Sequence, residues 1–188
     1  MRLPFCLILV MTALASISRA SLLETNLASR FVGSRHIHIY LPPSYSTDNS
    51  ARYPVLYLHD GQNVFSSAGT NAAFGWGSWE LDKTADRLSA TNGMREIIMV
   101  AVDNSRDRLH EYSGRHHEGT DAPTPYENYS SFLITELKPF VDHEFRTLTN
   151  HWDTAVMGSS LGGLCSVALA WDHPEAKGEG HRRGIVGR

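Results

Sequence analysis

Residues 154–162 read Thr154-Ala155-Val156-Met157-Gly158-Ser159-Ser160-Leu161-Gly162, and they join a short apolar strand to a helix of mostly small residues over 163–171. A strand, a G-x-S-x-G sequence and a helix in this order are typical of a sharp, strained turn that exposes its middle serine. Glycine is expected at 158 and 162, because a side chain at either position would collide with the adjoining strand or helix. The pattern predicts that the Ser160 hydroxyl points outward at the positive end of a helix dipole, as a candidate nucleophile.

Strand and helix patterns alternate through the rest of the chain, which predicts an α/β fold with a mostly parallel sheet. The predicted strands cover 35–41, 53–58, 97–102 and 154–157. The predicted helices cover 79–89, 129–141 and 163–171, and a long polar loop covers 103–125. The helix over 129–141 is amphipathic, with apolar residues at three- and four-residue spacing.

Length and charge limit the class of protein. The chain has 188 residues, enough for one domain with a core, and a formal net charge of −3. No basic stripe indicates a nucleic-acid surface. Arg2, an apolar run over 3–15 and Ser18-Arg19-Ala20 predict a secretory signal peptide over 1–20, without a stable membrane anchor after cleavage. We therefore expect a secreted or periplasmic protein.

Several segments together resemble the putative esterase family of the α/β-hydrolase fold, which includes siderophore trilactone esterases and feruloyl and acetylxylan esterases. The segments are Leu41-Pro42-Pro43-Ser44-Tyr45, residues 52–65, residues 98–104, Arg108 with Glu111-Tyr112, and residues 157–163. The resemblance runs from about Phe31 to about Ala176. It implies a three-layer α/β-hydrolase sandwich and a serine carboxylic-ester hydrolase that forms an acyl-enzyme on Ser160. It also implies a small-molecule or glycan-linked ester as substrate, and no cofactor.

Ester hydrolysis by a serine also needs hydrogen-bond donors for the oxyanion. The backbone N–H of Leu161 is one candidate, and the backbone N–H of Gln62, in the loop after the strand 53–58, is the other. An ordinary strand-exit turn is the alternative interpretation of this loop. Trp76 and Trp79 are candidates for lining an acyl or aryl pocket, although packing at the start of a helix is the commoner use of such residues.

The catalytic acid and histidine are not found where the fold would put them. In these hydrolases both follow the serine, on loops after later strands. Asp172 and His173 lie about a dozen helical residues beyond Ser160, roughly 18 Å away and out of hydrogen-bond reach. A base from the loop after Val102 would invert the expected order.

We therefore expect 21–176 to be the N-terminal portion of a hydrolase domain, incomplete at its C-terminal side and followed by an unrelated, disordered tail over 177–188. The strand ending at Met157 is then expected to be an exposed apolar edge that promotes aggregation. Two alternatives stay open: a catalytically dead hydrolase-like fragment or binding protein, and an acyltransferase that uses the same turn.

The remaining histidines and cysteines give no further site. His36 and His38 alternate on a strand, but no acid or cysteine lies at a familiar ligand spacing, so no metal site is predicted. Cys165 is interpreted as a small packing residue on the helix after Ser160. With Cys6 in the signal peptide, no disulfide framework is expected.

Overall fold

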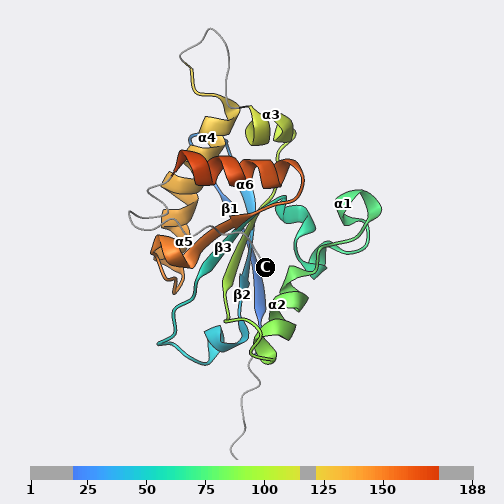
Figure 1. Ribbon diagram of the computed structural model, residues 1–188, viewed down its shortest axis with the longest axis vertical. Coiled ribbons are helices and arrows are strands. Elements are labelled where there is room, and N and C mark those ends of the chain that lie inside the picture. Colours follow the sequence, from blue (N-terminus) through green and yellow to red (C-terminus); the bar gives the residue numbers. More distant parts are fainter. Residues whose placement is uncertain (1–18, 115–121, 174–188) are drawn as a thin grey trace, which may run out of the picture.

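A five-stranded sheet forms the centre of the computed structural model, which describes residues 19–114 and 122–173 (Figure 1). The strands are β1 (Ser21–Leu27), β2 (Arg35–Leu41), β3 (Val55–His59), β4 (Ile98–Val102) and β5 (Thr154–Met157). Residues 1–18 of the predicted signal peptide and the predicted tail over 177–188 lie outside the described residues. Among the described helices, none is both long and apolar enough to cross a membrane.

The order of the strands in the sheet is β1-β2-β4-β3-β5. β3 pairs in parallel with β4 on one side and with β5 on the other, whereas β1, β2 and β4 pair antiparallel. The predicted α/β class is confirmed, with two parallel and two antiparallel strand pairs in a mixed sheet. The parallel half of the sheet is the part that carries the candidate site.

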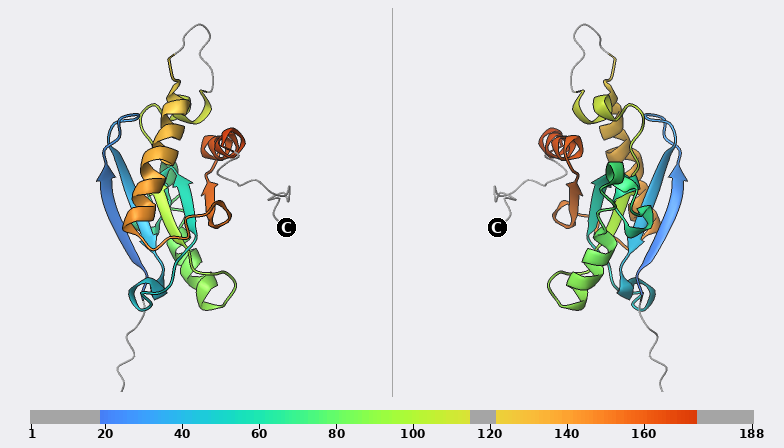
Figure 2. Two further views of the ribbon diagram at one scale, coloured as in Figure 1. Left: turned by 90° about the vertical axis from the view of Figure 1, so that its left-hand side faces the viewer. Right: turned by 90° about the vertical axis from the view of Figure 1, so that its right-hand side faces the viewer.

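The helices form two outer layers, which completes the predicted three-layer sandwich (Figures 1 and 2). One face of the sheet packs against α4 (Pro125–Phe132), α5 (Lys138–Glu144) and α6 (Leu161–Asp172). The other face packs against α2 (Leu81–Ala90). Two short helices, α1 (Ala72–Gly75) and α3 (Arg108–Ser113), lie in the loops after β3 and β4. The alternation of β2 explains the layers, since Ile37 and Ile39 enter the first core and Tyr40 the second.

The predicted amphipathic helix over 129–141 is longer in the structure. It begins at Pro125, because Thr124 and Glu127 form a capping box and proline fits the first helical position. A π-helical turn over Leu133–Leu137 joins α4 to α5. The whole segment buries Tyr129, Phe132 and Leu137 completely.

An exposed apolar surface lies on α6, beside the strand β5. Leu164, Val167 and Trp171 are 52%, 67% and 79% exposed. Together with Tyr112 and Ser113 of α3 they line a shallow cavity of about 240 Å³. Within the described residues β5 pairs only with β3, so its other edge is unpaired. Clustered exposed apolar groups and open strand edges promote association.

We predict that the double variant Val167→Ser, Trp171→Ser self-associates less than the parent chain, because it removes the two most exposed side chains of this surface. Sedimentation velocity at increasing protein concentration measures the change. Leu109→Ser is the matched control, since Leu109 is 57% exposed but lies on α3 and does not line the cavity. Equal association of the parent chain and both variants would contradict the prediction.

Candidate active site

Three chain segments leave the sheet at one edge, and together they form the candidate site. The parallel register pairs His59 with Val102 and Leu58 with Met157. The loops after β3, β4 and β5 therefore begin side by side. The carboxyl ends of parallel strands are where α/β proteins place their binding and catalytic groups.

The turn after β5 has the strained geometry that the sequence predicts. Ser160 has φ 56° and ψ −121°, an unfavourable conformation for a residue with a side chain. A Cβ on Gly158 would lie 2.6 Å from the carbonyl carbon of Gly162, so no side chain fits there. Ser160 is exposed at the N-terminus of the twelve-residue helix α6. Its role as nucleophile stays a prediction.

Two backbone N–H groups are free to bind an anion near this turn. The Leu161 N–H opens α6, and the Gln62 N–H lies in a 3₁₀ turn over Gly61–Asn63. Within the described residues neither group donates a hydrogen bond. The side chain of Gln62 is held separately, because its Oε1 accepts from the Asn104 N–H at 3.2 Å. These are the two groups proposed from the sequence as oxyanion donors.

Gly61 allows the loop after β3 to pack directly on β4. A Cβ at this position would lie 2.7 Å from the carbonyl carbon of Val102 and 2.8 Å from that of Ala101. Both atoms belong to backbone, which cannot move aside cheaply. A glycine is therefore required to bring the Gln62 N–H to this edge of the sheet.

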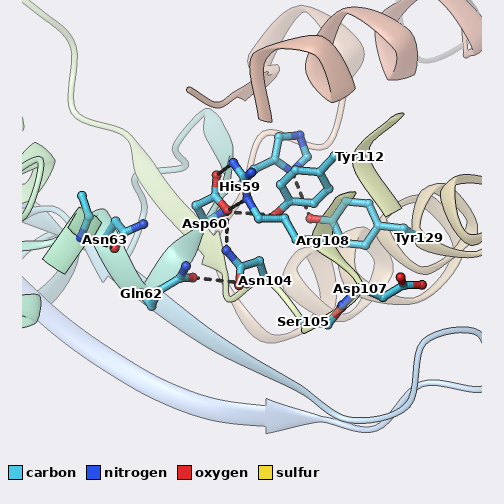
Figure 3. A network of polar contacts seen from close by, with 11 residues as sticks. His59, Asp60, Gln62, Asn63, Asn104, Ser105, Asp107, Arg108, Tyr112 and Tyr129 are labelled. Atoms are coloured by element: carbon cyan, nitrogen blue, oxygen red, sulfur yellow. Dashed lines mark hydrogen bonds and ion pairs between the residues drawn. The ribbon is translucent and has the colours of Figure 1, made fainter. Parts of the chain in front are cut away.

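Asp60 ties the loop after β3 to the loop after β4 (Figure 3). Its carboxylate is 3% exposed and accepts two hydrogen bonds from Arg108, at 2.6 Å from Nε and 2.7 Å from Nη2. The amide of Asn104 donates a third, at 2.6 Å. The Asp60 backbone is left-handed, with φ 59°. A bidentate guanidinium–carboxylate pair of this kind fixes both the position and the orientation of its partners.

His59 packs against the start of α6 and, in the part of the chain that the structure describes, is not placed to act as a base for Ser160. Its ring is 1% exposed, its Nδ1 is hydrogen-bonded to the hydroxyl of Tyr129 at 2.9 Å, and it has no hydrogen bond to Ser160. A Cβ placed on Gly162 would lie 3.2 Å from the Cβ of His59, which puts the histidine directly against the start of α6. Burial lowers the pKa of His59 to about 4, so its ring is neutral near pH 7.

The hydroxyl of Ser160 has no hydrogen-bonded base among the described residues. Asp172 and His173 lie at the far end of α6 and contact α4 instead. Asp172 accepts from the hydroxyl of Tyr126 at 2.8 Å, and His173 Nε2 is hydrogen-bonded to Ser130 Oγ at 2.7 Å. The sequence-based exclusion of this pair agrees with these contacts.

The two tryptophans proposed as pocket residues have different surroundings. Trp76 is 91% exposed, beside the fully exposed Phe74. Trp79 is half-buried and packs on the core under α2, which is the packing alternative considered for it. A cavity of about 330 Å³ lies at the opposite edge of the sheet, where Trp152 and Arg95 are among its lining residues. The substrate-binding role of Trp76 and Trp79 stays a prediction.

The polar network of Asp60 went unrecognised in the sequence, although its residues were visible there. In the sequence, Asp60, Asn104 and Arg108 lie in three separate segments that support only a family resemblance. Asp60 lies more than forty residues before the other two, and no local spacing links it to them. The signal that could have found it is an aspartate directly after a buried strand, where an unpaired charge would be costly.

We predict that Arg108→Gln lowers the free energy of unfolding by about 3 kcal/mol, because it leaves the buried Asp60 carboxylate without its cation. Urea denaturation measures the loss. Arg95→Gln is the control, since Arg95 is 60% exposed in its pair with Asp153 and its loss should lower the free energy of unfolding much less. Equal losses in the two variants would show that the Asp60–Arg108 pair contributes no more than a surface pair.

We predict that His59 makes the protein less stable in mild acid. Its pKa is about 4 in the folded state and 6.5 as a free side chain, so the unfolded chain binds a proton that the folded chain does not. The stability contributed by the neutral ring is complete above pH 6.5 and is lost as the pH falls toward 4, by about 3 kcal/mol.

Denaturation curves between pH 7 and pH 4 test this for the parent chain and for His59→Asn, whose amide can replace Nδ1 toward Tyr129. The variant should lose less stability over this range than the parent chain. The control His143→Asn removes a histidine whose side chain is 84% exposed and should leave the pH dependence unchanged. If the parent chain and His59→Asn lost the same stability between pH 7 and pH 4, the prediction for His59 would be wrong.

Comparisons with known proteins agree with this architecture. A family model described as "Putative esterase" matches residues 28–177. YbbA of Bacillus subtilis (strain 168) is 25% identical over 162 residues, which make up 84% of this chain and 59% of YbbA. The IroE-like serine hydrolase from Shewanella oneidensis has a TM-score of 0.63 at 24% identity, over 82% of this chain and 48% of that one. The CE1 ferulic acid esterase of Anaeromyces mucronatus in complex with ferulic acid has a TM-score of 0.56 at 20% identity, over 90% of this chain and 59% of that one.

The chain thus spans about half the length of these relatives. The match to the family covers β2 to β5 and leaves out β1, and it includes the turn at Ser160 and the loop after β3. The two solved structures share its α/β-hydrolase fold. The chain therefore belongs to the esterase family that this model describes.

Proposed function

We propose that this chain carries the nucleophile and the oxyanion donors of a secreted serine carboxylic-ester hydrolase. The observation that carries the proposal is the strained, exposed Ser160 together with the Leu161 and Gln62 N–H groups, which donate no hydrogen bond within the described part of the chain. Residues 1–20 would be a signal peptide, and residues 21–176 the portion of the hydrolase domain present in this chain.

The proposed reaction has two steps. Ser160 Oγ attacks the carbonyl carbon of the ester, and its proton passes to a base that the described residues do not supply and then to the departing alcohol. The Leu161 and Gln62 N–H groups hold the negative oxygen of the tetrahedral intermediate, aided by the positive end of the α6 dipole. Water then attacks the acyl-enzyme, which releases the carboxylic acid and restores the serine hydroxyl.

The substrate class is proposed from exposed aromatic residues in the chain segment after β3 and from one relative. The Anaeromyces mucronatus structure contains ferulic acid, an aromatic acid. In this chain Trp76 and Phe74 are exposed aromatic groups in the segment that follows the Gln62 turn. We propose an ester of an aromatic acid, small or glycan-linked, whose ring stacks on Trp76.

Reaction with a fluorophosphonate probe tests the nucleophile. The folded parent chain should be labelled at Ser160, because the phosphoryl oxygen of the adduct would occupy the oxyanion position and accept from the two N–H groups. Ser160→Ala should reduce labelling to background, as measured by intact-protein mass spectrometry. The control Ser159→Ala removes the neighbouring exposed hydroxyl and should retain labelling.

Circular dichroism confirms that each protein tested is folded. Labelling that persists in Ser160→Ala would place the nucleophile elsewhere. A folded parent chain that takes up no probe would instead support the alternative of a catalytically dead hydrolase-like protein.

A further inference from the structure

Two histidines and a glutamate converge on one face of the β1–β2 hairpin. The antiparallel register pairs Glu24 directly with His38, and His36 lies two residues earlier on the same face of β2. One ligand atom from each of the three residues lies within 4.8 Å of the others. The rings of His36 and His38 are perpendicular, with their centroids 4.6 Å apart.

Each imidazole ring is oriented by an oxygen acceptor that lies on the side away from Glu24. His38 Nε2 donates to Asp103 Oδ1 at 2.8 Å, and His36 Nδ1 donates to Asn26 Oδ1 at 3.3 Å. A carboxylate and an amide oxygen can only accept a hydrogen bond. These contacts therefore place the ring proton of each histidine on the nitrogen that faces away from Glu24. The lone pairs of His38 Nδ1 and His36 Nε2 are then directed toward Glu24.

The remaining contacts do not satisfy these lone pairs. His38 Nδ1 is buried and has no hydrogen-bond partner among the described residues, although Glu24 Oε1 lies 3.3 Å away. His36 Nε2 lies 3.7 Å from Glu24 Oε2. A lone pair that faces a carboxylate oxygen is repelled by it, and either a proton or a metal cation between the two removes the repulsion.

The distances fit a shared cation better than they fit direct hydrogen bonds. Hydrogen bonds between the less exposed charged groups are shorter, for example 2.8 Å for His38 to Asp103 and 2.6 Å for Arg108 to Asp60, whereas the exposed Arg30 lies 3.4 Å from Glu136. Ligands of a tetrahedral zinc ion, with bonds of about 2.0–2.2 Å, lie roughly 3.3–3.6 Å from one another. The nitrogen–oxygen separations of 3.3 and 3.7 Å are close to this range.

We propose that Glu24, His36 and His38 bind a divalent transition-metal ion of the Zn²⁺ class. Two imidazoles and one carboxylate suit Zn²⁺ better than Mg²⁺ or Ca²⁺, which prefer oxygen ligands throughout. Glu24 is 52% exposed, so a water molecule can complete a tetrahedral site from solvent. Asp103 and Asn26 serve as the outer partners that hold the imidazoles in place.

The ion would have a structural role that is independent of the proposed hydrolysis. It would tie β1 to β2 and, through Asp103, to the start of the loop after β4. Spacing within the sequence could not predict this site, because its acid lies on β1 and only the register of the hairpin brings it to the histidines.

Titration of metal-free protein with ZnCl₂ tests the proposal by calorimetry, on the full chain prepared without a histidine tag. We expect one ion per chain with a dissociation constant in the micromolar range or below. His36→Ala and His38→Ala should each weaken binding at least about 10-fold, and Asp103→Asn about 10-fold. Zn²⁺ should raise the melting temperature of the parent chain but not that of Glu24→Gln, whose exposed side chain makes it a mild substitution.

Two controls separate this site from adventitious histidine binding. His143→Ala removes a histidine whose side chain is 84% exposed, and His116→Ala with His117→Ala removes an adjacent pair outside the described residues. Both variants should bind Zn²⁺ as the parent chain does. Binding that is only millimolar, that is unchanged in His36→Ala and His38→Ala, or that Mg²⁺ reproduces would overturn the proposal.

Discussion

The parallel pairing of β3 with both β4 and β5 is the constraint on which the candidate site depends. It makes three strands end at one level, so that Asp60, Asn104 and Ser160 come from loops that begin side by side. The glycines then set how closely these loops approach. Gly61 packs against the backbone of β4, and Gly158 packs against the backbone of Gly162. Neither approach leaves room for a side chain, so backbone contacts fix the positions of the Leu161 and Gln62 N–H groups.

The buried charge of Asp60 completes this arrangement. A carboxylate that is 3% exposed is stable only when its hydrogen-bonding capacity is met, and Arg108 and Asn104 meet it from the loop after β4. The same pair holds the left-handed backbone that leads into Gly61 and Gln62. His59, neutral and buried beside Tyr129, fills the space beneath α6. The loop that offers the Gln62 N–H is therefore held by charge on one side and by packing on the other.

Local sequence patterns were enough to predict every strand of the sheet except β1. The strands over 35–41 and 154–157 agree with the structure to the residue, because alternation or an apolar run defines them. β1 was missed, since Ser21–Leu27 contains Glu24 and Asn26 and is half solvated at the edge of the sheet. α3 was missed because Arg108–Ser113 is a short polar helix whose helical conformation depends on tertiary contacts. The Asp60 network and the Glu24–histidine cluster join distant segments, and only the sheet register brings their members together.

The structure of a phosphonate adduct would test the central claim most directly. The account predicts that, in crystals of the chain treated with a small fluorophosphonate, phosphorus is bonded to Ser160 Oγ. Its phosphoryl oxygen should then lie about 2.7–3.2 Å from both the Leu161 and the Gln62 nitrogen. A phosphoryl oxygen directed away from either N–H group, or phosphorus bonded to a different side chain, would contradict the account.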